Sequence, residues 1–409
     1  MSASRRRKAA MNLRPNYTRR KFNDTPKIEV FASEIEQGVL DQAGTLAAMP
    51  FVHPHVALMP DAHIGMGSSV GTVFGTVGAV IPAAVGVDIG CGMIALQTQF
   101  TTADLAERDL TKLRDLVEAT IPLSPGNYNQ WVMEGTADAR TRELAQLAED
   151  TGVDLDHSPK WRQQLGSLGG GNHFIELCLD EADRVWLFLH SGSRGVGNKI
   201  AQKHIFAARE QCAKHWVRLP HKDLAYLTEG TDEFDSYLAD LKWAQRFAWL
   251  NREEMLDRFA RCVTEFMGTE VEEAQRINCH HNYTVVEKHY GQDVWLTRKG
   301  AVRADEGTPA LIPGSMGTAS YVVEGLGYAP ALRSAPHGAG RRYSRTKARE
   351  LFDVADLDAR MEGIVYRPGE AWVDEIPDAY KDIDQVMADA ARLVTVKHKL
   401  RQVLNVKGT

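Results

Sequence analysis

The run Gly86-Val87-Asp88-Ile89-Gly90-Cys91-Gly92-Met93 places a carboxylate and a thiol three residues apart among glycines, directly after the apolar stretch 79–87. A cysteine packed in a core usually has bulky apolar neighbours, whereas Cys91 is flanked by glycines and stands near an acid. A thiolate needs positive charge nearby to stay ionised. The run therefore favours a metal ligand over a packed thiol.

Four further segments follow the same pattern, in which a histidine stands at the Gly- or Asn-rich end of a strand-like run. They are Gly171-Asn172-His173-Phe174-Ile175-Glu176, Leu189-His190-Ser191-Gly192-Ser193-Arg194, Cys279-His280-His281-Asn282 and Pro336-His337-Gly338-Ala339-Gly340-Arg341. A lone histidine is usually an ordinary hydrogen-bonded residue. Four in such settings beside Asp88 and Cys91 predict one shared site, because loops next to rigid strands are where sites sit.

One aspartate, one cysteine and three histidines suit a pair of divalent ions if the thiolate bridges them. Imidazole and thiolate favour Zn, Co, Fe or Mn over Mg or Ca. Zinc would bind such a site tightly whatever metal the cell uses, so the ligands do not identify the metal.

His337 has different surroundings from the other histidines. Residues 333–349 carry six positive charges and no acid. A metal ligand gains nothing from adjacent cations, but a histidine that attacks a phosphate gains charge neutralisation from them. The segments Thr297-Arg298-Lys299-Gly300-Ala301 and Pro313-Gly314-Ser315-Met316-Gly317-Thr318 also suit phosphate, because their glycines let backbone N–H groups approach an anion. A P-loop is missing from the sequence.

The composition is that of an ordinary globular enzyme, with 409 residues, 44% hydrophobic and 25% charged. No run approaches 18 apolar residues, so no transmembrane helix is expected. Five scattered cysteines without a C-x-x-C pair predict reduced thiols and a cytoplasmic location. Residues 1–21 hold eight cations and no acid, a charge of +8. Since the net charge of the whole chain is −6, the remaining residues carry −14. We expect residues 1–25 to form a flexible basic arm, which could also touch RNA or another polyanion.

The rest of the chain predicts an α+β fold, a single large domain of mixed and antiparallel sheets with peripheral helices over residues 26–409. Its predicted elements are short strands with Gly-rich turns over 26–100, a helix over 103–121, a loop over 122–130, a helix over 138–150, a strand over 185–189, a mainly helical segment over about 199–268, strands over 294–297 and 319–323, and a C-terminal helix over 383–400.

At this point the motifs resemble those of the RtcB family of RNA ligases. The shared motifs are Met59-Pro60-Asp61-Ala62-His63-Ile64-Gly65, the D-I-G-C-G run, G-N-H-F-I-E, L-H-S-G-S-R-G, C-H-H-N-Y, R-K-G-A, P-G-S-M-G, H-G-A-G-R, A-Y-K-D-I-D and a final Val406-Lys407-Gly408. They come in the family's order from about residue 28 to the end, so only the basic arm falls outside the likeness. Met66 departs from relatives that carry a basic or aromatic residue there.

The resemblance implies a GTP- and Mn(II)-dependent ligase that joins RNA ending in a 2′,3′-cyclic phosphate or 3′-phosphate to RNA with a 5′-hydroxyl. It implies one manganese on Asp88, Cys91 and His173, another on Cys91, His190 and His281, and His337 as the guanylylated nucleophile. His281 is chosen over His280 because it precedes Asn282, as the ligand does in the family. The other implied residues are Asn172, Glu176, Ser315, Tyr380 and Lys407 for the guanylate, with Lys299, Asp61, Arg194 and Arg345 serving the nucleotide, the RNA ends or the chemistry.

Two other functions remain open on the residues alone. A binuclear metallohydrolase such as a phosphodiesterase explains the five metal-type ligands equally well but leaves His337 in its cationic loop unexplained. A non-catalytic RNA-binding protein would depend on the basic arm. The physiological RNA, whether a split transfer RNA or a cleaved RNA under repair, the need for an activating protein and the oligomeric state are not fixed by the sequence.

Overall fold

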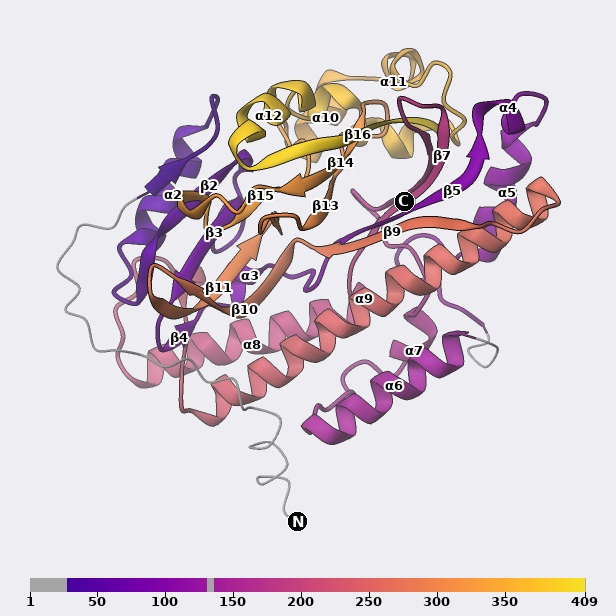
Figure 1. The fold of residues 1–409 in the computed structure, drawn as a ribbon. Helices are drawn as coiled ribbons and strands as arrows, with labels where there is room; N and C mark the ends of the chain where they lie inside the picture. Colours follow the sequence, from indigo (N-terminus) through magenta and orange to yellow (C-terminus); the bar gives the residue numbers. More distant parts are fainter. Residues whose placement is uncertain (1–27, 131–135, 409) are drawn as a thin grey trace.

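The computed structural model describes residues 28–130 and 136–408 (Figure 1). The predicted basic arm, residues 1–25, lies outside this part of the chain. Within the described residues, none of the helices is both long and apolar enough to cross a membrane.

The larger of two main sheets has seven strands, and every neighbouring pair in it is antiparallel. In spatial order the strands are β13 (Pro309–Ile312), β14 (Ser320–Gly325), β16 (Val394–Val406), β6 (Phe174–Leu179), β7 (Arg184–Ser191), β5 (Gly92–Thr101) and β9 (Glu273–His280). Successive side chains of a strand point to opposite faces. In β5, Met93 and Ala95 accordingly enter one core while Ile94 and Leu96 enter another.

The second sheet has five strands, in the order β1 (Ile28–Val30), β2 (Val52–His63), β3 (Val70–Thr76), β11 (Gln292–Lys299) and β10 (Asn282–His289). Only the β1–β2 pair is parallel among its described strands. Ala57, Met59 and Val73 of this sheet belong to the same core as Met93 and Ala95 of the other. The two sheets therefore pack on one shared core.

Helices cover the outer faces of both sheets (Figure 1). The long helix α9 (Asp232–Met267) packs Met255 and Phe259 against the seven-stranded sheet, and α5 (Leu110–Thr120) joins the same core. Thr231 caps the N-terminus of α9 by accepting a hydrogen bond from the Phe234 N–H, and Gly268 ends the helix with a φ of 71°. The other α-helices are α2 (Gln37–Ala47), α3 (Pro82–Val85), α4 (Thr102–Leu105), α6 (Thr136–Thr151), α7 (Trp161–Gln164), α8 (Arg194–Lys214), α10 (Arg345–Leu351), α11 (Val354–Arg360) and α12 (Ile383–Asp389).

Short elements complete the fold. They are the strand pairs β4 (Ala79–Val80) with β8 (Leu227–Thr228) and β12 (Ala301–Arg303) with β15 (Ser334–Pro336), and the 3₁₀ turns η1 (Lys222–Leu224), η2 (Ala329–Ala331), η3 (Glu370–Glu375), η4 (Pro377–Ala379) and η5 (Ala390–Arg392).

The predicted α+β class, the mainly helical 199–268 segment and the predicted strands are confirmed. The predicted helix over residues 383–400 is wrong beyond residue 389, because the chain continues into β16, which lies between β14 and β6. Val394, Thr395 and Val396 are β-branched and so favour a strand. The pairing of β16 with a strand on each side outweighs the helical spacing of its apolar residues. The predicted helix over 103–121 is divided into α4 and α5, where Asp109 caps the second helix. The 26–100 segment also contains α2, which its predicted strands did not include.

Candidate active site

The glycine-rich run forms a tight turn between α3 and β5. The Cys91 N–H donates to the Asp88 carbonyl at 3.2 Å, which brings both side chains to one side of the turn. Gly90 has a φ of 71°, and a Cβ there would lie 2.9 Å from atoms of Ala248 and Gln245 in α9. Glycine is required here because the turn presses against a helix backbone in a left-handed conformation.

The five predicted metal ligands lie together at the ends of the strands. His173 immediately precedes β6, His190 lies in β7, and His281 is the single residue between β9 of one sheet and β10 of the other. The Cys91 Sγ lies 3.3 Å from His173 Nε2 and 3.2 Å from His190 Nε2. His173 Nε2 lies 3.1 Å from Asp88 Oδ2, and the Nε2 atoms of His190 and His281 are 2.9 Å apart.

These contacts form two groups that share one atom. Asp88, Cys91 and His173 make the first group, and Cys91, His190 and His281 make the second, with the donor atoms of each within 4.8 Å of one another. The facing imidazole nitrogens and the common sulfur can all direct lone pairs into the same space, as the ligands of a cation do. The donor set therefore fits two divalent ions bridged by the thiolate.

The electrostatics of the cluster agree with metal binding. Burial lowers the pKa values of His190 and His281 well below their ordinary value, so both rings are neutral and able to act as ligands. Burial opposes ionisation of Asp88, but its contacts with His173 bring its pKa to about 2. Burial and the neighbouring Asp88 raise the pKa of the Cys91 thiol, so ionising it needs the positive charge that a metal supplies.

His337 faces this cluster from the opposite wall. It directly follows β15, and its ring centroid lies 4.6 Å from that of His281. The Asp61 Oδ2 in β2 accepts hydrogen bonds from the backbone N–H groups of His337 at 3.1 Å and Gly338 at 3.2 Å. The same oxygen lies 2.6 Å from His337 Nδ1. Asp61 thus fixes both the loop and the ring, although it does not line the cavity.

Four residues of the cluster, Asp88, Cys91, His190 and His281, line one cavity of about 340 Å³ together with His337. A pocket of this size suits a small ligand. Five of the residues predicted to contact the nucleotide line it, namely Asn172, Ser315, Tyr380, Lys407 and Lys299, and Arg345 lines it as well.

Lys299 is held by backbone rather than by acids. Its ammonium donates to the carbonyl groups of Met66 and Ser68, and burial lowers its pKa to about 7. This residue therefore supports the loop that carries Met66 as well as facing the cavity.

Glu176 is placed differently from the other predicted nucleotide contacts. It is buried in β6, where its Oε1 accepts a hydrogen bond from Asn405 at 2.7 Å. Burial raises the pKa of its carboxyl to about 8. Glu176 is not among the described residues that line the cavity, although Phe174, two residues earlier in β6, is.

A buried carboxylate that the sequence did not reveal organises the cationic side of the cavity. Glu375 accepts from the Tyr380 hydroxyl at 2.7 Å and lies 3.1 Å from Lys407 Nζ. Arg345 lies 2.6 Å and Arg341 3.3 Å from its other oxygen. Burial opposes its ionisation, yet Lys407 and Arg345 bring its pKa to about 2. Nothing in the sequence around Asp374 and Glu375 distinguished these two acids from ordinary surface residues. Their ion pairs with Arg345 and Arg349 neutralise part of the positive charge near His337.

Arg194 begins α8 and is not among the residues that line the cavity. Its Nε donates to Ser167 Oγ at 3.1 Å and its Nη2 to the Ser124 carbonyl at 3.4 Å. A Cβ at Gly169 would overlap both the Arg194 guanidinium and the His173 ring, which shows how closely the two side chains approach.

The adjacent residues His280 and His281 point in different directions, because β9 ends at His280 and the chain turns there into the other sheet. His280 turns away from the cluster, with its Nδ1 2.8 Å from the Gly90 carbonyl and its ring against Trp249. His281 faces the cluster, as the motif comparison implied.

An α+β fold with a buried Cys/His/Asp cluster beside a histidine in a cation-lined cavity defines an enzyme of phosphate chemistry. The family model described as tRNA-splicing ligase RtcB matches residues 42–408. The chain is 44% identical over 401 residues to RNA-splicing ligase RtcB1 of Escherichia coli strain ATCC 25922, covering 91% of this chain and 95% of that protein. It is 43% identical to RNA-splicing ligase RtcB of Escherichia coli strain K12, with the same coverage, and 29% identical to tRNA-splicing ligase RtcB of Pyrobaculum aerophilum over 93% of this chain and 92% of that protein.

The chain belongs to the RtcB family of RNA-splicing ligases, as its motifs predicted. It is therefore an enzyme whose substrate is RNA. The family match extends through every segment that contributes to the cavity.

Proposed function

We propose that this ligase uses GTP and two Mn(II) ions to join RNA ending in a 2′,3′-cyclic phosphate or 3′-phosphate to RNA with a 5′-hydroxyl. One observation carries the proposal: the two ligand groups share Cys91, and the His337 ring lies 4.6 Å from a ligand ring in the same cavity. A site for metal hydrolysis alone leaves unexplained a fourth histidine that stands among cations beside a buried carboxylate.

Asp88, Cys91 and His173 would hold one ion, and Cys91, His190 and His281 the other. Bound there, the ions would neutralise charge on the phosphate oxygens and orient the phosphate. Manganese is one of several metals that these donors accept, so its identity is part of the proposal.

His337 would attack the α-phosphorus of GTP through Nε2. A bond forms between nitrogen and phosphorus, the bond to the β-phosphate oxygen breaks, and pyrophosphate leaves. The Asp61 carboxylate lies 2.6 Å from Nδ1, so its charge would favour a proton on that nitrogen and leave the Nε2 lone pair free.

The guanylate would then pass to RNA. An oxygen of the 3′-phosphate attacks the same phosphorus and the bond to His337 breaks, which gives a pyrophosphate-linked RNA end. The 5′-hydroxyl attacks the RNA phosphorus and GMP leaves. A cyclic phosphate must first be hydrolysed to the 3′-phosphate.

The remaining predicted residues have roles that their positions support to different degrees. Asn172, Ser315, Tyr380, Lys407 and Lys299 line the cavity and would surround the guanylate. Glu176 is not among the lining residues, and a direct contact with the guanylate would compete with the hydrogen bond from Asn405. Arg345 would face the phosphates from its pairing with Glu375, and Arg194 would serve the RNA end.

The test is incubation with manganese and GTP labelled at the α-phosphate. The wild type should gain an acid-labile adduct that resists hydroxylamine, and His337→Ala should gain none. His215→Ala is the matched control, because His215 is exposed at the end of α8. A binuclear hydrolase would give no adduct with the wild type and would keep its activity in His337→Ala.

We further propose that residues 26–409 act as one catalytic domain in the cytoplasm, with the basic arm 1–25 as an accessory. All five cysteines are free, as reduced thiols would be. A chain without residues 1–25 should still seal RNA ends. Loss of sealing would instead make the arm essential and favour the RNA-binding alternative.

A further inference from the structure

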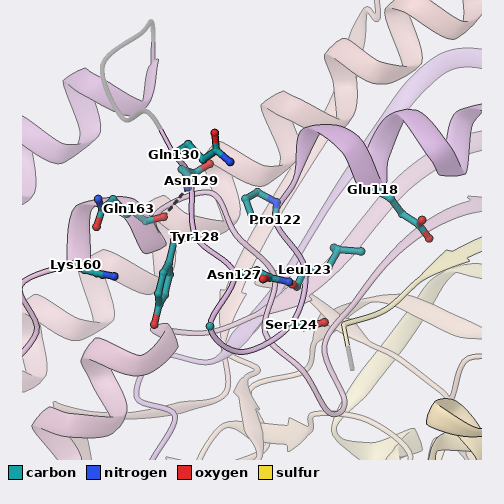
Figure 2. A pocket seen from close by; sticks show the side chains of 11 residues that line it. Glu118, Pro122, Leu123, Ser124, Asn127, Tyr128, Asn129, Gln130, Lys160 and Gln163 are labelled. Atoms are coloured by element: carbon teal, nitrogen blue, oxygen red, sulfur yellow. Dashed lines mark hydrogen bonds between the residues drawn. The ribbon is translucent and has the colours of Figure 1, made fainter.

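A second hollow, of about 660 Å³, lies outside the catalytic cavity, between the loop 122–130 and α7 (Figure 2). Its lining is polar, with amide side chains, one tyrosine and one lysine. We name it the Tyr128 groove, lined by Glu118, Pro122, Leu123, Ser124, Gly126, Asn127, Tyr128, Asn129, Gln130, Lys160 and Gln163.

Tyr128 has the properties of a stacking residue. Figure 2 shows its ring standing upright in the groove between Lys160 and Asn127. The side chain is 37% exposed, and Lys160 Nζ lies 5.6 Å from its ring centroid. An aromatic ring left open to solvent beside a cation matches the two groups that bind single-stranded nucleic acid, stacking on a base and attraction to a phosphate.

The loop that carries Tyr128 is fixed on both sides of it. The Asn129 amide donates to the Gln163 and Leu165 carbonyls at 2.7 and 2.6 Å, and its oxygen accepts from Arg258 at 2.6 Å. Asn127 donates to the Leu123 carbonyl at 2.6 Å. The backbone on both sides of Tyr128 is therefore held before any ligand arrives, which reduces the entropy lost on binding.

Two observations place the groove near the catalytic cavity. Arg194, beside His173, donates to the carbonyl of Ser124, which lines the groove. A small hollow shares Glu118 with the groove and shares Met316 and Lys407 with the catalytic cavity. The negative charge of Glu118 is neutralised by its ion pair with Arg367.

We propose that the Tyr128 groove binds an unpaired nucleotide of the RNA substrate near the end being joined, with Tyr128 stacking on the base and Lys160 facing a phosphate. This deepens the proposed function and rests on it. Stacking accepts any base, so the groove would favour single-stranded ends without selecting a sequence.

The test measures binding and adduct formation separately on the full chain. Binding is followed by fluorescence anisotropy with a labelled single-stranded RNA that ends in a 3′-phosphate, and with its 5′-hydroxyl counterpart, in the absence of GTP. Tyr128→Ala should weaken binding of one of them by about 5- to 100-fold, the range for loss of one stacked base, and Tyr128→Phe should restore it. Tyr290→Ala, a change at an exposed tyrosine outside the groove, should bind normally.

A set of RNAs with one abasic position each provides the second measurement. With the wild type, a single abasic position should lose affinity, and in Tyr128→Ala that position should have no further effect. Equal affinities of wild type and Tyr128→Ala for every RNA would overturn the inference. Labelling with GTP should be the same in both proteins, so a missing adduct in the wild type would count against the proposed function rather than against the groove.

Discussion

The Asp61 carboxylate holds the His337 loop through one oxygen, which accepts from the backbone N–H groups of His337 and Gly338 and lies 2.6 Å from the ring Nδ1. Asp61 is fully buried in β2, and its position is therefore set by the sheet and not by the loop. A rigid strand thus orients a histidine that the chain presents on a glycine-rich turn.

Asp61→Asn should preserve this loop while removing the charge beside Nδ1. The amide oxygen can still accept from the backbone, but the ring is no longer held in the tautomer that frees Nε2. We expect adduct formation with GTP to slow by about 10²- to 10⁴-fold, as for loss of a positioned acid or base, with little change in melting temperature. Single-turnover labelling measures this rate, and an unchanged rate would show that Asp61 only shapes the loop.

The shared thiol predicts an asymmetry between two metal-ligand variants. Cys91→Ala should lose both ions, because its sulfur belongs to both groups, whereas His281→Ala should keep the ion held by Asp88, Cys91 and His173. After dialysis, metal analysis should find close to no metal ion per chain in Cys91→Ala and one ion per chain in His281→Ala. Cys212→Ala, which changes a buried thiol of α8 outside the cluster, should keep two. Full metal content in Cys91→Ala would refute the bridging sulfur.

The sequence predicted for a physical reason that the candidate ligands would cluster. Cys91, His173 and His281 each stand next to a glycine or asparagine at the end of a strand, and Asp88 stands three residues before Cys91, so local pattern and chemistry coincide. Glu375 could not be found in this way, because its importance comes from Lys407, Tyr380 and two arginines that reach it from distant segments.

The errors in the fold have a similar origin. β16 contains enough helical spacing to predict a helix over 383–400, and only its pairing with β14 and β6 makes it a strand. Alternation along β6 puts Glu176 on the same face as Phe174, which lines the cavity, but only the structure shows that its carboxyl accepts from Asn405 of β16. Such placements depend on contacts between strands that are far apart in the sequence.

Glu176 should make stability depend on pH. Burial raises the pKa of its carboxyl from 4.5 to about 8, so between these values the folded protein keeps a proton that the unfolded chain releases. The free energy of unfolding should therefore fall as pH rises through this window, by at most about 1.4 kcal/mol per pH unit. Glu176→Gln should remove this contribution, which urea unfolding from pH 5 to 8.5 would show as a shallower fall. Parallel curves for the two proteins would mean that Glu176 is ionised in the folded state.

Gly192 packs directly against the metal site, so a larger residue there tests how tightly that site is packed. It follows β7, and a Cβ there would overlap the Asp88 carboxylate, which also accepts the Ser193 N–H at 3.0 Å. Gly192→Ala should therefore displace Asp88 and weaken the ion held with His173 while leaving the ion on His190 and His281, so metal analysis should fall from two to one. Gly44→Ala is the matched control: it lies exposed in α2 with no atom within 4 Å of the added Cβ, and it should raise the free energy of unfolding by about 1 kcal/mol through helix propensity with both metals retained. If Gly192→Ala keeps two ions, the turn at residues 88–91 can move away from β7, and Asp88 is held by the metal instead of by the fold.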